Sequence, residues 1–272
     1  MSKIHLHKIF YTTERTAKTS GVASANHAKI LLNQIFKSAI YDEIVKTNPV
    51  EHIPAFKMNG KRPARETIHR ALTVSEVSTF LSACKDSWYF NFFRLMLATG
   101  MRCGECGALT WNDVDFKKGV IHITRTVTRT SAGKWVIGNT PKTQKSKRDI
   151  PMNREINEIL QNQRYNNEAL KGNVISLQGP IFTTEKGELI RPSHVCSIIY
   201  SVCRKVKKAG GTLEGFSSHA LRDTFASMAY KKGVPMNVIK ELMGHSSYAM
   251  TADLYGHIYD EQKKGAMELM SM

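Results

Sequence analysis

The sequence lacks any apolar stretch of about eighteen residues, the length that a membrane-spanning helix needs. This excludes a membrane span and a stop-transfer segment, and no membrane partner is expected. A signal-like apolar N-terminus is also missing, and the five cysteines form an odd set that does not suit a disulfide framework. We therefore expect a reducing, cytoplasmic location. Internal repeats and low-complexity tracts are absent too, so nothing suggests a solenoid.

Acidic residues are scarce relative to basic ones. The chain has 23 Asp and Glu against 39 Lys and Arg, a formal net charge of +16, and the basic residues are spread along its whole length. A surface of this kind attracts polyanions, which favours a nucleic-acid partner. Charge alone does not distinguish DNA from RNA, but aromatic-rich sheet motifs of the RRM type are missing.

The pattern of apolar residues predicts two domains. With 272 residues and 42% hydrophobic content, the chain can bury a substantial core. Apolar residues at spacings of three and four over Ser20–Lys46 predict an amphipathic helical pair. A basic segment with few apolar residues follows, as expected of a linker. We predict a short helical N-terminal domain over residues 1–56, a linker over 57–72 and a larger domain over 73–272.

The larger domain is predicted to be mainly helical with a small inserted sheet, an α+β fold. Thr73 and Glu76 have the spacing of a capping box, which predicts a helix start. Gly100 is expected to form a tight turn that places Arg102 at the entrance of a helix. Alternating β-branched residues predict a three-stranded antiparallel sheet. Its strands are expected at Val120–Val127, Trp135–Ile137 and Arg148–Ile150.

Helical patterns return after the predicted sheet, between Gly and Pro breaks. The first begins at Asn153, and the others are expected at Ser193–Lys208, His219–Lys232, Asn237–Met243 and Tyr248–Tyr255.

Four short motifs follow one another along the larger domain. Taken singly they are weak: an isolated H-x-x-R is most often a capping histidine and a solvated arginine, although its two residues share one helix face. Their fixed order is more specific. The motifs are Arg102-x-x-Glu105, His219-x-x-Arg222, Gly244-His245 and the later Tyr255.

Together these motifs resemble the signature of the tyrosine recombinase (phage integrase) family, over about residues 20–260. The resemblance extends to Pro141-Lys142-Thr143, followed by Ser146, Arg148 and Ile150-Pro151, which is similar to the hairpin that carries the family's catalytic lysine. The segment 33–50 is similar to the close of the family's core-binding (SAM-like) domain. Relative to many family members the N-terminal region is short, so we expect it to lack some helices of that domain.

The resemblance implies an enzyme that breaks and rejoins DNA strands through a 3′-phosphotyrosine, without a metal or other cofactor. Arginine suits such a site, because its planar fork donates paired hydrogen bonds to phosphate oxygens and stays charged. Arg102 and Arg222 are therefore the expected phosphate clamp. The phenol of Tyr255 is a poor nucleophile while protonated, and His219 is the candidate base. A lysine with a lowered pKa can protonate the leaving 5′ oxygen, and Lys142 is the candidate acid.

Two further roles come from the resemblance alone. His245 is expected to donate a hydrogen bond to the scissile phosphate. Glu105 is expected to support the site by bonding His219 or Arg102.

Alternatives remain at several of these positions. Tyr248 and Tyr259 flank the favoured nucleophile, and Tyr259 is the second choice. Lys145 and Lys147 compete with Lys142 in the same basic segment. Cys103 and Cys106 form a C-x-x-C pair, but without a second pair this spacing on a helix is most often a coincidence, so no metal is expected. Cys196 and Cys203 are expected on one side of a helix as small buried thiols.

Double-stranded DNA with attachment-type sites is the expected substrate, and a tetramer assembled on DNA is the expected active form. A directionality factor or a host DNA-bending protein is a further expected partner. Two other functions compete: a DNA-binding remnant of a mobile element that no longer recombines, and a type IB topoisomerase-like enzyme. The segment between Gly244 and Tyr255 and the compact size favour the recombinase.

Overall fold

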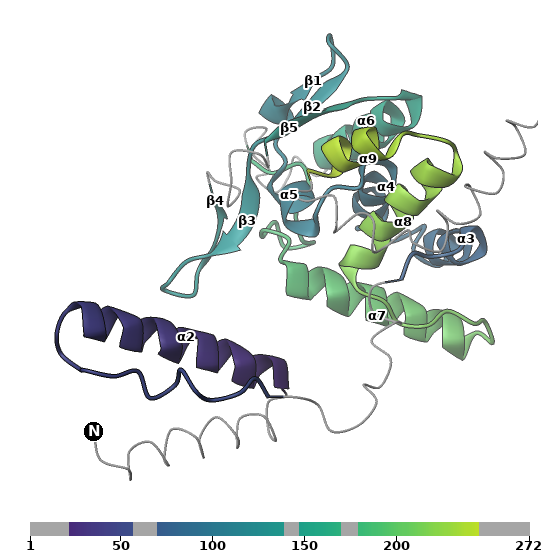
Figure 1. Ribbon diagram of the computed structural model, residues 1–272. Helices are drawn as coiled ribbons and strands as arrows, with labels where there is room; N and C mark the ends of the chain where they lie inside the picture. The colour runs from purple at the N-terminus through teal and green to yellow at the C-terminus, as the bar shows by residue number, and fades with distance from the viewer. Residues whose placement is uncertain (1–21, 57–69, 139–146, 170–178, 245–272) are drawn as a thin grey trace, which may run out of the picture. The chain divides into compact units, whose positions relative to one another are not determined.

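The computed structural model describes residues 22–56, 70–138, 147–169 and 179–244. Backbone contacts divide the chain into two compact units, Met1–Ala64 and Arg65–Met272. Both are drawn in Figure 1, and each is described here by itself. In the described part of the chain no helix is long and apolar enough to cross a membrane.

In its described residues, 22–56, the N-terminal unit contains a long helix, α2, which runs over Val22–Tyr41. The predicted helical pair is therefore wrong for this segment, and the reason is local: neither glycine nor proline interrupts these residues. The chain after α2 turns back along it (Figure 1). The side chain of Asn26 fixes this return, because its amide exchanges hydrogen bonds of 3.0 and 2.9 Å with the backbone of Phe56.

The C-terminal unit is mainly helical, as predicted. Its helices follow the apolar periodicity of the sequence and mostly end at the glycine and proline breaks. In chain order they are α3 (Val74–Ala83), α4 (Phe90–Thr99), α5 (Cys103–Ala108), the 3-10 helix η2 (Trp111–Asp113), α6 (Arg154–Ala169), α7 (Pro192–Lys208), α8 (Ser218–Lys231) and α9 (Met236–Met243).

The predicted capping box at the start of α3 is confirmed. The Thr73 hydroxyl accepts a hydrogen bond from the Glu76 amide at 3.2 Å, and the Glu76 carboxylate accepts one from the Thr73 amide at 2.9 Å. Arg70 also binds this carboxylate and holds the pKa of Glu76 at about 2. The helix therefore begins with two of its exposed amides satisfied.

Aromatic residues form the centre of the core. Phe80 of α3 is fully buried and packs edge to face against Phe93 of α4 and against Phe216, with ring centroids 5.0 and 5.1 Å apart. Phe216 lies two residues before α8. This cluster fixes α3, α4 and the start of α8 to one another.

The predicted single sheet is instead two sheets. The first has the order β1-β2-β5, and the second is the hairpin β3-β4; all pairs are antiparallel. The strands are β1 (Val114–Asp115), β2 (Val120–Ile123), β3 (Thr126–Arg129), β4 (Trp135–Gly138) and β5 (Arg148–Pro151).

The predicted strand over 120–127 breaks at Arg125. The guanidinium of Arg125 reaches away to Asp113 at 2.5 Å and to the Thr110 hydroxyl at 2.8 Å. Alternation of β-branched residues continues through this point, so the sequence pattern does not reveal that the chain changes partner strand.

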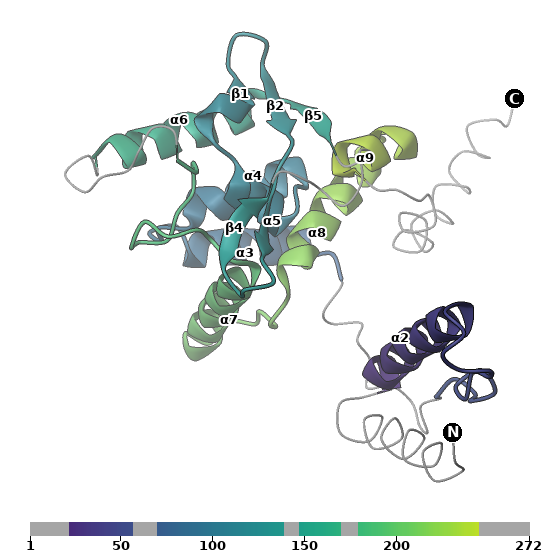
Figure 2. The same cartoon turned by 90° about the vertical axis from the view of Figure 1, so that its left-hand side faces the viewer.

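Helices α5 and α9 pack against strands that lie far from them in the sequence. Helix α5 packs closely on β3, where a Cβ at Gly104 would lie 2.6 Å from the Thr126 hydroxyl. Helix α9 contacts both α8 and β5, and Figure 2 shows β5 beside α9. Hydrogen bonds from Arg102 to the Gly244 carbonyl and from Arg148 to the Leu242 carbonyl bring the start of α5 and the start of β5 to the end of α9, although the three are far apart in the sequence.

Candidate active site

A glycine turn delivers the first arginine of the site. Helix α4 ends at Gly100, whose φ of 64° is left-handed, and a Cβ there would collide with the ring of Phe225 on α8. Glycine meets both requirements, since it adopts this conformation without strain and leaves room for the ring. The turn predicted at this residue is confirmed, and two residues later Arg102 occupies the N-cap of α5.

Glu105 ties Arg102 to the start of α5. Its carboxylate accepts hydrogen bonds from the Arg102 amide at 2.9 Å and from Arg102 Nη1 at 2.8 Å. The glutamate side chain is 4% exposed, whereas that of Arg102 is 39% exposed. Arg102 therefore has one side anchored in the protein and the other accessible.

A second arginine, Arg148 at the start of β5, binds the same carboxylate. Arg148 Nη1 and Nη2 donate to the two oxygens of Glu105 at 3.2 and 2.8 Å, a bidentate ion pair whose side chains are both at most 5% exposed. Arg148 was expected only in the predicted hairpin, without a role in the site. The available signal was an arginine beginning a strand that is otherwise apolar at alternate positions.

Opposing effects act on the Glu105 carboxyl. Burial would raise its pKa, but the hydrogen bonds and positive charges of Arg148 and Arg102 outweigh burial and hold the pKa below its usual range. Glu105 is therefore ionised at neutral pH.

Arg222, on α8, is buried among positive charges. Only 4% of the residue is exposed, and its guanidinium donates to two neutral groups, the carbonyls of Gly100 at 2.6 Å and of Met243. Burial, followed by repulsion from Arg102 and Arg148, lowers the pKa of Arg222 to about 9, although Glu105 and Asp223 oppose the shift. The described residues therefore neutralise this cation only in part.

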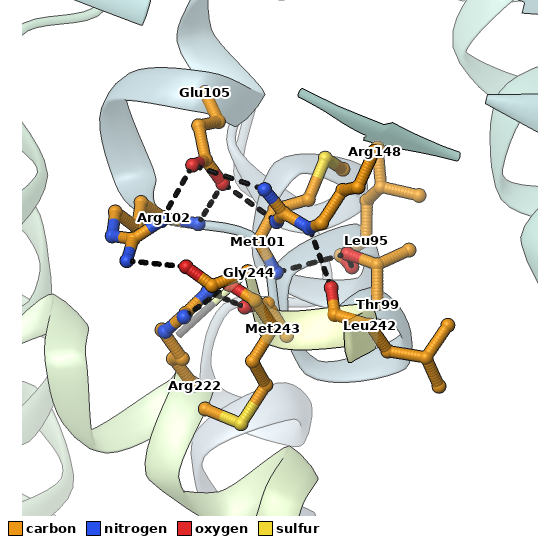
Figure 3. A network of polar contacts seen from close by, with 11 residues as sticks. Leu95, Thr99, Met101, Arg102, Glu105, Arg148, Arg222, Leu242, Met243 and Gly244 are labelled. Atoms are coloured by element: carbon orange, nitrogen blue, oxygen red, sulfur yellow. Dashed lines mark hydrogen bonds and ion pairs between the residues drawn. The ribbon is translucent and has the colours of Figure 1, made fainter. Parts of the chain in front are cut away.

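The three arginines meet at the C-terminal end of α9 (Figure 3). Three consecutive carbonyls there accept from three different guanidinium groups. Arg148 Nε donates to Leu242 at 2.5 Å, Arg222 Nη2 donates to Met243, and Arg102 Nη2 donates to Gly244 at 3.2 Å. The exposed carbonyls of a helix end carry partial negative charge, so this contact is favourable.

His219 lies one turn before Arg222 on α8 and its side chain is exposed. The two residues of the H-x-x-R motif are thus on the predicted helix. Three other predicted site residues, Lys142, His245 and Tyr255, lie outside the described residues. So do Lys145, Tyr248 and Tyr259, whereas Lys147 is described and exposed.

The two cysteines of the C-x-x-C pair lie in α5 beside the arginine cluster. Burial raises the pKa of the Cys103 thiol to about 12 and raises that of Cys106 well above its usual value, so both stay protonated. Within the described ranges no group of three or more His, Cys, Asp and Glu side chains could hold a metal ion. Cys203 is buried on α7, and Cys196 is half-buried on the same helix.

The arrangement is suited to holding an anion. Three guanidinium groups converge on a helix end, two of them also bind the Glu105 carboxylate, and Arg102 remains open to solvent on one side. A desolvated surplus of positive charge interacts strongly with a phosphate, and arginine offers it paired donors. The cluster is positioned in advance by the fold, as stabilisation of a charged transition state requires.

Comparisons with known proteins agree with this geometry. The model of the phage integrase family matches residues 70–262. A XerC-like tyrosine recombinase from Caldanaerobacter subterraneus subsp. tengcongensis is 30% identical over 219 residues, which cover 76% of this chain and 55% of the relative. The ICEBs1 integrase of Bacillus subtilis is 28% identical over 256 residues, covering 89% of this chain and 63% of the relative. The chain thus spans less than two thirds of the length of these relatives.

A solved structure shows the same fold. The Tn1549 transposon integrase in complex with transposon right end DNA matches with a TM-score of 0.77 and 24% identity, over 98% of this chain and 85% of that chain. The family match begins at Arg70 and includes Arg102, Arg148 and Arg222. On this evidence, the chain belongs to the phage integrase family.

Proposed function

We propose that this protein is the site-specific recombinase of a mobile element, and that it breaks and rejoins DNA through a 3′-phosphotyrosine. The observation that carries the proposal is the convergence of Arg102 and Arg222, from motifs more than a hundred residues apart, at the end of α9. The relatives named above are recombinases and integrases, and the related Tn1549 integrase is bound to transposon DNA.

The arginine cluster has the charge that a phosphodiester needs. The scissile phosphate carries one negative charge and gains charge on its oxygens at the pentavalent transition state. Arg102 and Arg222 would bind the non-bridging oxygens, with donors fixed beforehand by Glu105 and by the carbonyls of Gly100 and Met243. In the described part of the chain no carboxylate forms an ion pair with the buried Arg222, so this cation gains most from that anion.

The remaining steps are assigned to residues of the family motifs. The Tyr255 phenol oxygen attacks phosphorus, and the P–O bond to the 5′ oxygen breaks. His219 takes the phenol proton, and Lys142 gives a proton to the leaving 5′ oxygen. His245 donates a further hydrogen bond to the phosphate. The phosphotyrosyl bond retains the energy of the phosphodiester, so a 5′ hydroxyl can reverse the attack without ATP or a metal ion.

Domain roles and partners form part of the same proposal. The helical unit that contains α2 would bind DNA as the end of a core-binding domain, with residues 57–72 as a linker and 73–272 as the catalytic domain. The substrate would be double-stranded DNA with attachment-type sites, bound by a tetramer of this chain in the cytoplasm. A directionality factor or a host DNA-bending protein would choose the direction of the reaction.

A suicide substrate tests the chemistry. The protein is incubated with a nicked half-site from the DNA that flanks its gene, and a covalent adduct is sought on a denaturing gel. We expect an adduct with the wild-type chain and with Tyr259→Phe, but none with Tyr255→Phe. An adduct that persists in Tyr255→Phe and disappears in Tyr259→Phe or Tyr248→Phe would identify Tyr259 or Tyr248 as the nucleophile instead.

Two other results would replace the proposal. Binding to the half-site without any adduct would identify a recombination-deficient DNA-binding protein. Nicking and relaxation of plasmid DNA without sequence preference would identify a topoisomerase-like enzyme. A gel-shift titration in physiological salt accompanies the assay, because phosphate contacts weaken steeply as salt rises.

A further inference from the structure

We infer that Arg148 is a positioning residue of the active site, which sets the geometry of the α9 end. The inference rests on the proposed function, because its readout is the rate of DNA cleavage. It differs from the phosphate clamp, since Arg148 acts through Glu105 and the end of α9.

Arg148 uses all three nitrogens of its guanidinium on the protein. Nη1 and Nη2 bind the two oxygens of Glu105, and Nε donates to the carbonyl of Leu242 at 2.5 Å. Its charge is neutralised by a bidentate carboxylate, whereas Arg222 donates to neutral carbonyls. Among the described residues Arg148 is thus paired with a carboxylate and Arg222 is bound only by carbonyls, although both side chains are buried.

These bonds join three separate parts of the chain. Arg148 is the first residue of β5, where it pairs with Ile123 of β2. Glu105 belongs to α5, and Leu242 to the last turn of α9. The guanidinium therefore locks the end of α9 to the carboxylate that orients Arg102 (Figure 3).

Gly244 gives independent support from sterics. It ends α9 with a left-handed φ of 64°, and a Cβ there would lie 3.1 Å from Arg148 Nη1 and 3.2 Å from Cδ. The arginine therefore packs directly against the Cα of this residue. In the sequence His245 follows Gly244 immediately. The Gly-His motif therefore connects the end of α9, against which Arg148 packs, to a residue predicted to bind the phosphate.

The chemistry requires an arginine at this position. A lysine can bind Glu105, but its single ammonium cannot hold both carboxylate oxygens and the Leu242 carbonyl in one plane. A displacement of about 1 Å at a reacting group can cost about a hundredfold in rate. We therefore expect Arg148→Lys to slow cleavage more than it weakens binding.

The test measures binding, cleavage and helix-end mobility separately, on the full chain. Variants are Arg148→Lys and Arg148→Met, with Arg154→Lys and Arg154→Met as controls, because the Arg154 side chain is 93% exposed on α6. Half-site affinity comes from gel shift, and the adduct rate comes from single-turnover reaction at saturating protein. Hydrogen exchange of peptides covering 236–244 is measured without DNA.

We expect Arg148→Lys to bind DNA within about threefold of wild type and to form the adduct about a hundredfold more slowly, with faster exchange at the end of α9. The Arg154 variants should match wild type in all three measurements. Wild-type cleavage by a folded Arg148→Lys or Arg148→Met chain would overturn the inference. So would equal losses in affinity and in rate, which indicate a merely structural role.

Failure of the proposed function gives a different pattern. Wild-type protein would then bind DNA and form no adduct, and hydrogen exchange alone would test whether Arg148 positions the end of α9. Unchanged exchange at 236–244 in Arg148→Lys would overturn the positioning role, and faster exchange would support it.

Discussion

Replacing Glu105 with glutamine should destabilise the C-terminal unit by about 3–5 kcal/mol, the range for removing one partner of a buried ion pair. The side chain is 4% exposed and accepts four hydrogen bonds, two on each oxygen. Oε1 accepts from Arg102 Nη1 and Arg148 Nη1, while Oε2 accepts from the Arg102 amide and Arg148 Nη2. In either orientation the amide group of glutamine therefore faces two N–H donors, which leaves donors unpaired.

The assay can isolate the relevant unit. All three tryptophans of the chain, Trp88, Trp111 and Trp135, lie in the C-terminal unit, so their fluorescence follows its unfolding in urea. For a domain of this size the expected loss corresponds to a fall of about 10 °C in melting temperature. Glu158→Gln is the matched control, because Glu158 forms an exposed pair with Arg154 on α6. It should change stability by less than about 0.5 kcal/mol.

The pH dependence gives a second readout. The folded-state pKa of Glu105 lies below its ordinary value of 4.5. The unfolded chain therefore takes up the proton first, and the stability from ionised Glu105 is complete above that value and is lost as the pH falls below it. The gap between wild type and Glu105→Gln should narrow in acid. A gap below about 1 kcal/mol at pH 7, or one that does not change with pH, would refute the reasoning.

Two further predictions concern neighbouring residues. Gly244→Ala should lower the free energy of unfolding in urea by at least about 1 kcal/mol more than Gly119→Ala does. Both glycines have a left-handed φ, but only a Cβ at Gly244 would meet the Arg148 guanidinium. Equal losses of stability in the two variants would contradict that contact. Burial raises the pKa of Asp223 to about 6, although the charge of Arg222 opposes the shift. The unfolded chain therefore loses this proton first, and ionisation of the buried Asp223 lowers the stability of the fold as the pH rises from about 4 through 6. Asp223→Asn should then stabilise the protein at pH 8 by up to about 3 kcal/mol and have little effect at pH 4, and a gain independent of pH would count against this.

Local rules were sufficient for several helices of the C-terminal unit, although not for the helical pair predicted in the N-terminal unit. The capping box at Thr73, the turn at Gly100 and the α7–α9 segments each depend on residues a few positions apart, and their predicted bounds agree with the structure within one or two residues. The sheet was predicted less well. The strand β1 has two residues, too few for a pattern, and the break between β2 and β3 occurs where Arg125 pairs with Asp113, a residue twelve positions away.

The sequence by itself determined the family, the order of the motifs and the helical character of the larger unit, because motif spacing, apolar periodicity and glycine or proline breaks are local properties. Only the tertiary structure decided that Arg148 shares Glu105 with Arg102, and that three arginines bind three successive carbonyls at the end of α9. These contacts join residues up to 142 positions apart. Which buried guanidinium meets which carboxylate or carbonyl depends on how the helices and strands pack, and no spacing in the sequence records that choice.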